Sequence, residues 1–385
     1  MAGLALHQLA AKTWLPEDSG LFTLDWQAQR YSSPQAYYQA VYQAFSHASA
    51  ETGETSIAFC IGGQVVRLNF ASQALVSRLT PALEHLRVEP GTDAQLEVCL
   101  WDSVSTGTPF PPHPWTGEGA GSIARDFDPG EGRIFYHDDQ LRMYFYLEEM
   151  ALFLDRNSRR AIFWVPDAAG LPVHETAAPL RSLLHWWFGD QNTQFVHGAG
   201  VGTAEGGVLL IGRGGSGKST STLACLGSGL QIAGDDYCLV TIQDQPVVHS
   251  LYCSAKIQPG YLRHLPSYTL INPQPIDNGA EKSIVYLCDL HPEQVIRQFP
   301  LQALFIPRIT GGRDTSLKSA PAMQGLKALA PSTIFQLVEP GEMAFQTLAR
   351  LVKQVPSFYL DLGTDLRQIP VVIQEYLLNR RNSNG

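Results

Sequence analysis

Short runs of alternating hydrophobic and polar residues dominate the first half of the chain, a pattern typical of β-strands. Residues 56–61 and 64–70 flank Gly62-Gly63, and this arrangement predicts a hairpin. Further strands are predicted at 21–26, 94–101, 134–136, 142–147, 150–154 and 160–165, and apolar residues at helical spacing predict helices at 37–45 and 73–86. The pattern therefore predicts a β-rich α+β N-terminal domain over residues 1–175.

In the second half of the chain, strand-like and helix-like segments follow one another. Strands are predicted at 194–201, 208–211, 230–233, 237–242, 247–251, 283–287, 301–306 and 358–362, and amphipathic helices at 176–188, 341–352 and 366–378. This order predicts an α/β domain over residues 176–385, with the boundary near residues 172–179. The aromatic residues 186–188 lack neighbouring basic residues, so we interpret them as a packing plug between the two halves.

Composition narrows the class of protein. The chain has 385 residues, 44% of them hydrophobic, and a formal net charge of −9. This acidic balance argues against nucleic acid or an anionic membrane surface as a partner. Six cysteines without C-x-x-C spacing favour buried thiols in a reducing cytoplasm over a disulfide framework or a zinc site. No run approaches the length of a membrane span, so we expect a cytoplasmic protein, and its oligomeric state stays open.

A glycine-rich segment joins the predicted strand 208–211 to a helix-forming stretch. Its residues read G-x-x-x-x-G-K-S and then Thr: Gly212, Arg213, Gly214, Gly215, Ser216, Gly217, Lys218, Ser219 and Thr220. Glycines allow successive backbone N–H groups to face one concavity, which suits phosphate. Lys218 is then expected at the β- and γ-phosphates of ATP and Ser219 at Mg²⁺. A glycine-rich turn that binds nothing is the alternative, but the flanking strand and helix favour nucleotide binding.

An acidic pair, Asp235-Asp236, follows the next predicted strand. We expect a three-turn helix after the glycine-rich loop and the pair at the end of a strand beside that loop, where open α/β sheets bind ligands. One carboxylate could hold the metal and the other could act as the base toward an acceptor hydroxyl. A polar turn is the alternative. His197, on the strand before the loop strand, is a further catalytic candidate.

Other charged residues are weaker candidates. Lys256 and Arg308 lie near the ends of predicted strands, where a cation would stabilise a transferring phosphoryl group. A solvated charge at a strand end explains each of them equally well. Asp138-Asp139 lies between two predicted strands, so we interpret it as a polar turn.

Residues 196–201, 212–219 and 233–236, in this order and spacing, resemble the catalytic core of the HPr kinase/phosphorylase family and its phosphoenolpyruvate carboxykinase relatives. The resemblance implies a P-loop kinase domain of that type. It implies Lys218 on the phosphates, Ser219 on Mg²⁺, Asp235 and Asp236 as metal-linked carboxylate and base, and His197 beside that base. The chain has Thr220 where HPr kinases have Glu, so the acceptor stays open.

The sequence therefore predicts a kinase that uses ATP and Mg²⁺ to phosphorylate a hydroxyl, of serine type, on a peptide, a protein or a small molecule. The catalytic residues would be Asp236, Asp235, His197 and Lys218, with Ser219 and Asp235 as metal ligands. A nucleotide-responsive binding or assembly protein without phosphoryl transfer is the alternative. Carboxykinase chemistry would need further metal-binding and carboxylate-binding residues that the sequence does not identify.

Overall fold

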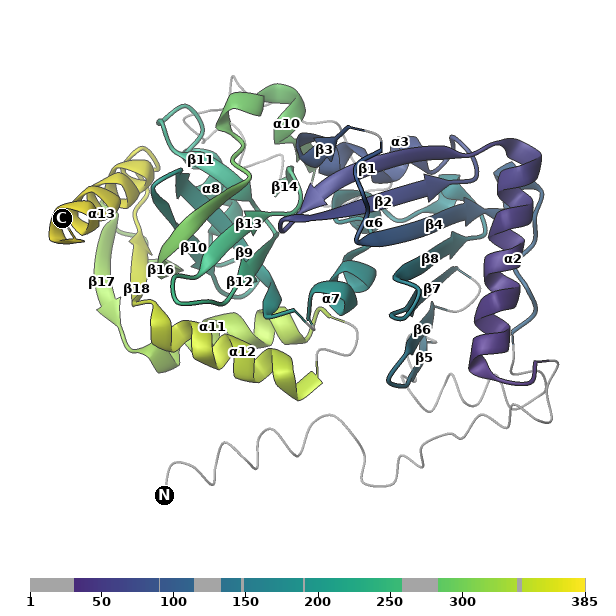
Figure 1. The fold of residues 1–385 in the computed structure, drawn as a ribbon. Coiled ribbons are helices and arrows are strands. Elements are labelled where there is room, and N and C mark those ends of the chain that lie inside the picture. The colour runs from purple at the N-terminus through teal and green to yellow at the C-terminus, as the bar shows by residue number, and fades with distance from the viewer. Residues whose placement is uncertain are drawn as a thin grey trace.

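The two halves of the chain each build one large β-sheet, and helix α7 lies between them (Figure 1). The computed structural model describes residues 31–89, 91–113, 133–146, 149–189, 191–257, 283–337 and 341–384. The strand predicted at 21–26 lies outside these residues. Within them the fold is mixed α/β, and none of their helices is long and apolar enough to span a membrane.

Within the described residues, the N-terminal sheet has eight strands in the order β3-β1-β2-β4-β8-β7-β6-β5. They are β1 (Thr55–Ile61), β2 (Gln64–Phe70), β3 (Arg87–Val88), β4 (Leu96–Asp102), β5 (Arg133–His137), β6 (Leu141–Tyr146), β7 (Met150–Asp155) and β8 (Arg160–Val165). The predicted hairpin is confirmed as the antiparallel β1–β2 pair, and the meander as β5 to β8. Asp138 accepts backbone hydrogen bonds from Gln140 and Leu141, so the polar-turn interpretation is also confirmed.

Helices cover both faces of this sheet. On one face lies α2 (Pro34–Thr52), which starts at a Ser33 cap and buries Tyr37, Tyr38 and Val41. On the other lie α3 (Val76–Leu79) and the 3₁₀ helix η2 (Pro81–Leu86). One helix over 73–86 was expected, but Pro81 has no N–H and breaks it. Short helical turns complete this half, α4 (Ser103–Thr106) and η3 (Ala168–Gly170).

The second sheet, as far as the structure describes this half of the chain, also has eight strands, in the order β10-β9-β12-β13-β16-β18-β17, with β11 beside β9. They are β9 (Thr193–Thr203), β10 (Gly206–Ile211), β11 (Gln231–Gly234), β12 (Tyr237–Thr241), β13 (Val247–Ser250), β16 (Gln298–Ile309), β17 (Ser316–Ala320) and β18 (Ser357–Leu362). β16 also pairs with β10, so five strands close into a ring. A separate hairpin joins β14 (Ser254–Ile257) to β15 (Ser283–Tyr286).

Two pairs of helices enclose this sheet. α8 (Lys218–Ala224) and α13 (Gln368–Asn384) share one apolar cluster with it. α11 (Ala322–Ile334) and α12 (Gly341–Gln354) share the cluster on the opposite face. The sequence analysis missed α11, because Gly325 and Pro331 interrupt a stretch of otherwise good helix formers. The remaining helical turns are α10 (Leu287–Leu290) and η5 (Pro292–Gln294).

The two halves share one hydrophobic core cluster, to which β1, β2, β9 and β12 all contribute. The helix predicted at 176–188 is two helices, α6 (Val173–Ala177) and α7 (Arg181–Gly189), because Leu180 takes a left-handed conformation with φ 58°. Trp186 and Phe188 of α7 are fully buried in the shared cluster, and Trp187 Nε1 donates to Gln64 of β2. The aromatic residues therefore act as the predicted plug.

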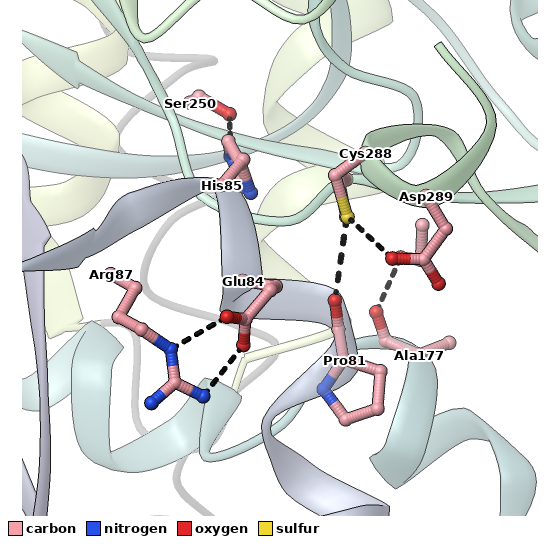
Figure 2. Close-up of a disulfide and its surroundings, with 10 residues drawn as sticks. Pro81, Glu84, His85, Arg87, Ala177, Ser250, Cys288 and Asp289 are labelled. Carbon is pink, nitrogen blue, oxygen red and sulfur yellow. Dashed lines mark hydrogen bonds and ion pairs between the residues drawn. A yellow bond between two sulfur atoms is a disulfide. The ribbon is translucent and has the colours of Figure 1, made fainter. Parts of the chain in front are cut away.

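One prediction about the cysteines is wrong. Cys253 and Cys288, 35 residues apart, form a disulfide. The β14–β15 hairpin brings them together, since Ser254 is paired with Tyr286. Spacing in the sequence gave no indication of this contact, because the two cysteines meet only once that hairpin forms. Figure 2 shows the surroundings of this disulfide, next to η2 of the first half.

Candidate nucleotide and acid–base site

The glycine-rich segment forms an open loop between β10 and α8. Gly212, Gly215 and Gly217 have φ values of 142°, 77° and 105°, which residues with a Cβ rarely adopt. A Cβ placed on Gly214 or Gly215 would meet no atom within 4 Å, so one side of the loop is open. α8 has 7 residues, shorter than the predicted three turns, because Gly227 and Gly229 turn the chain away soon afterwards.

Lys218 is the first residue of α8 and is only 6% exposed. Its Nζ donates to the carbonyl oxygens of Gly212 and Arg213, at 2.7 and 3.3 Å. The lysine therefore folds back across its own loop. An ammonium group held in this way lies next to the backbone that would surround a phosphate, and it can exchange carbonyl oxygens for phosphate oxygens.

The acidic pair follows a strand, β11, as predicted, and one further strand separates β11 from the loop strand β10. β9 lies between them: Gly198 pairs with Ile211 of β10, and His197 pairs with Tyr237 of β12. β11 and β12 both pair with this far edge of β9, and Asp235-Asp236 forms the connection between them. The β9–β10 hairpin explains this order of strands. Because β9 occupies the edge of β10, β11 pairs with the far edge of β9 instead. The loop and the acidic pair still emerge at adjoining positions.

Asp236 is half-buried between two nitrogen donors. His197 Nε2 lies 3.0 Å from Oδ1, and Lys256 Nζ lies 2.8 Å from Oδ2. Burial on its own raises the pKa of Asp236, but the His197 hydrogen bond and the positive charge of Lys256 outweigh it and hold this pKa well below its usual range. Asp236 is therefore a carboxylate at neutral pH. Of the two cations considered from the sequence, Lys256 belongs to this group.

The end of α11 holds His197 in place through two hydrogen bonds. Its Nδ1 lies 3.0 Å from the carbonyl oxygen of Ser332, and its backbone N–H donates to the Thr333 hydroxyl at 3.2 Å. The ring thus faces an acceptor at each nitrogen, Ser332 on one side and Asp236 on the other. Sequence analysis missed Ser332 and Thr333. The sequence held one indication of their role. The run of good helix formers at 322–330 predicts a helix, and Ser332 and Thr333 would then lie near its end, where backbone carbonyl groups lack partners.

Asp235 has different surroundings. It is 1% exposed, and its Oδ2 accepts a hydrogen bond of 3.2 Å from the Lys256 backbone N–H. Burial, and then the charge of Asp236, raise the pKa of Asp235 to about 6, while Ser219, the Lys256 N–H and Lys218 act in the opposite direction. Oδ1 is buried and accepts no hydrogen bond from the described residues. A buried carboxylate oxygen without a donor, close to the Ser219 hydroxyl, fits a ligand set for Mg²⁺.

Arg308 is engaged elsewhere. Its Nε and Nη2 lie 2.8 and 2.5 Å from Asp361 Oδ1, and its guanidinium stacks on Tyr359 at 3.7 Å from the ring centre. Lys318 pairs with the other carboxylate oxygen of Asp361 at 2.9 Å. Arg308 therefore takes part in a separate ion-pair cluster at the end of β16, rather than in the group around Asp236.

Comparison with known proteins adds little to this geometry. No family model and no curated protein matches the chain. Among solved structures, the HPr(Ser) kinase/phosphatase from Coxiella burnetii aligns with 14% sequence identity over 49% of this chain and 99% of its own, with a TM-score of 0.27. At this TM-score the alignment supports no assignment, so the family resemblance stays a prediction and the functional proposal rests on the site itself.

Proposed function

We propose that the chain is a kinase that transfers the γ-phosphoryl group of ATP, with Mg²⁺, to a hydroxyl of serine type on a peptide, a protein or a small molecule. The observation that supports this most is that an open glycine-rich loop lies beside two carboxylates whose pKa values are shifted in opposite directions. Asp236 is ionised between His197 and Lys256, and Asp235 is buried with one oxygen lacking a donor. A polar turn needs neither feature.

In this proposal, the glycine-rich loop binds the nucleotide. Backbone N–H groups of residues 212–219 would receive the phosphates, and Lys218 would move from its loop carbonyls to the β- and γ-phosphate oxygens. Ser219 and Asp235 would hold Mg²⁺, since both lie at the same place and Asp235 Oδ1 has no donor among the described residues. When bound, the metal neutralises charge on the phosphates.

In this proposal, Asp236 activates the acceptor hydroxyl. Its carboxylate would orient the acceptor hydroxyl and receive the proton as the oxygen–phosphorus bond forms. The lowered pKa makes Asp236 a weak base, which suits a loose transition state in which the hydroxyl loses its proton late. His197 fixes the direction of the carboxylate from one side. Lys256 lies on the other side, where its charge stabilises the transferring group.

Two variants test this division of roles. Lys218→Ala should abolish the rise in melting temperature that Mg-ATP produces, whereas Asp236→Asn should retain this rise and lose Mg²⁺-dependent ADP formation by about 100-fold or more. Lys353→Ala, an exposed lysine on α12, is the control for Lys218. If both site variants form ADP and label acceptor peptides from γ-labelled ATP like the parent, the site assignment is wrong.

The same experiment separates the two candidate functions. A kinase places labelled phosphate on a serine-containing peptide or on an acceptor in cell extract. If Mg-ATP stabilises the parent protein but yields neither ADP nor labelled acceptor, the chain is a nucleotide-responsive binding protein instead.

A further inference from the structure

Three residues with metal-binding side chains meet at the junction of the two halves. They are His85 of η2, Cys253 just before β14 and Cys288 of α10, and their ligand atoms all lie within 4.8 Å of one another. Ligands of a tetrahedral zinc site are about 3.3 to 3.8 Å apart, given bonds of about 2.0 to 2.3 Å. Small side-chain movements would therefore bring these three atoms onto one ion. The junction is shown in Figure 2, where His85 and Cys288 are labelled.

The backbone around the cluster is already fixed. Both sulfur atoms lie 3.5 Å from the carbonyl oxygen of Pro81, so both side chains point at the same turn of η2. The Cys253 N–H donates to the Ala82 carbonyl, and the Leu287 N–H donates to the Cys253 carbonyl. These bonds connect η2, β14 and α10 independently of the sulfur atoms. These backbone hydrogen bonds would therefore keep the three ligand residues close together even when the disulfide is open.

His85 has the features of a metal-binding histidine. Its Nε2 lies 2.6 Å from the Ser250 hydroxyl, while Nδ1 is buried and has no hydrogen-bond partner among the described residues. With Nε2–H donated to Ser250, Nδ1 carries a free lone pair. Histidine ligands commonly donate their second ring N–H in this way.

We propose that the reduced chain binds one soft divalent cation, Zn²⁺, through Cys253 Sγ, Cys288 Sγ and His85 Nδ1, with water as the fourth ligand. A thiol reductant first opens the disulfide: the sulfur–sulfur bond receives two electrons and two protons, and the reductant is oxidised to its own disulfide. Zn²⁺ then displaces the two thiol protons, which pass to solvent. The disulfide and the zinc-bound dithiol are alternative states of one site, since the same two sulfurs serve both.

The position of the site gives the ion a structural role. Its ligands come from the first half, through His85, and from the second half, through both cysteines. Cys253 also lies next to β14, which carries Lys256, the partner of Asp236. Zinc at this junction would connect His85 of the first half to Cys253 and Cys288 of the second in a reducing environment, where the disulfide between the two cysteines opens.

Metal titration of the full-length protein tests the proposal. After reduction with a phosphine, we expect one equivalent of Zn²⁺ to bind in competition with a chromophoric chelator. Co²⁺ in place of Zn²⁺ should give thiolate-to-metal charge-transfer absorption. The oxidised protein should bind no such equivalent. Reduced protein that binds no Zn²⁺ beyond the oxidised form would overturn the proposal.

Matched variants locate the ligands. Cys288→Ser should remove the cobalt charge-transfer band or cut zinc affinity by at least 100-fold, and His85→Ala should weaken binding by about 10- to 100-fold. Cys60→Ser and His47→Ala change a cysteine and a histidine outside the cluster and should leave binding unchanged. Equal loss in the control variants would contradict the assignment.

A measurement on the unaltered sequence avoids any folding defect of the variants. Zn²⁺ should protect Cys253 and Cys288 from alkylation, as read by peptide mass spectrometry, and leave Cys60 as reactive as before. Protection of all three cysteines to the same extent, or of none, would overturn the proposal. Neither result bears on phosphoryl transfer, so this test is independent of the kinase proposal.

Discussion

Asp235 and Asp236 are neighbours in sequence, but their surroundings give them different chemistry. Asp236 has a nitrogen donor on each oxygen and stays ionised, whereas burial without enough donors raises the pKa of Asp235 to about 6. Two adjacent carboxylates whose pKa values are pushed apart are a common arrangement for dividing roles in a catalytic site. The proposed division assigns the metal to Asp235 and the acceptor hydroxyl to Asp236.

Lys256 should control the pH at which Asp236 works. The charge of Lys256 lowers the pKa of Asp236, so Lys256→Gln should raise this pKa and begin to protonate the carboxylate at a higher pH. The acidic limb of the kcat–pH profile for ADP formation should therefore move to higher pH. Lys318→Gln, which removes a partner of Asp361 instead, is the control. An acidic limb that stays in place in Lys256→Gln would show that Asp236 does not limit the rate.

The candidate site was only partly predictable at the residue scale. The glycine-rich loop, His197 and the acidic pair follow from local patterns, because glycine, lysine and carboxylate spacing reflect the chemistry itself. Ser332 and Thr333 could not be found in this way, since they contact His197 through tertiary packing across 135 residues or more. Lys256 was one of two candidate cations, and only the fold separated it from Arg308.

Helix α11 is the element that positions His197. The carbonyl oxygen of Ser332, in the last turn, accepts from the imidazole, and the Thr333 hydroxyl accepts from the His197 backbone N–H. Thr333 is 1% exposed. The end of α11 thus orients a residue on a strand that is far away in sequence.

Replacing Thr333 tests this role. Thr333→Val keeps the shape but leaves the buried His197 N–H without an acceptor, which should cost about 1 to 3 kcal/mol of unfolding free energy. It should also lower kcat with little change in KM for ATP, because the phosphate loop is untouched. Thr333→Ser keeps the hydroxyl and should restore most of kcat. If Thr333→Ser is as impaired as Thr333→Val, the hydroxyl is not the positioning group.

The close approach of β9 and β10 depends on small residues. A Cβ at Gly202 would overlap the backbone of Gly206 and Gly207 at the turn of the hairpin. Gly202→Ala should therefore lower the unfolding free energy by about 1 to 3 kcal/mol, measured by chemical denaturation. Gly170→Ala is the control, since a Cβ there meets nothing within 4 Å. Equal stability of the two variants would mean that the hairpin is less tightly packed than described.

Strand prediction succeeded where periodicity is local, and helix prediction failed where a single residue interrupts the pattern. The β1–β2 hairpin and the β5–β8 meander follow from alternation and turn residues. Three helix predictions were altered or missed because of backbone breaks: Pro81 divides one helix, the left-handed Leu180 divides another, and Pro331 concealed α11. Such breaks depend on what packs around them, which the sequence pattern does not specify.

At the scale of the whole molecule, one core cluster joins the two sheets, and the Cys253–Cys288 pair of the second half lies against η2 of the first half. The cluster includes Phe59 and Leu68 of the first half with Phe195 and Leu239 of the second. Of this shared core, only the aromatic plug at residues 186–188 was predicted from the sequence. The strand contributions to the core and the Cys253–Cys288 contact were not visible, because both depend on how distant strands pair. The order of strands around β9 was equally hidden, although it determines where the acidic pair emerges.

The most direct test of the central claim is a crystal structure of the full chain with Mg²⁺ and a non-hydrolysable ATP analogue. The account predicts the triphosphate in the loop of residues 212–219, Lys218 Nζ on the β- and γ-phosphates, and the metal on Ser219 and Asp235. Asp236 should then lie within hydrogen-bonding reach of a hydroxyl placed in line with the γ-phosphate. A nucleotide bound elsewhere, or a loop-bound triphosphate whose metal is remote from Asp235, would contradict the account.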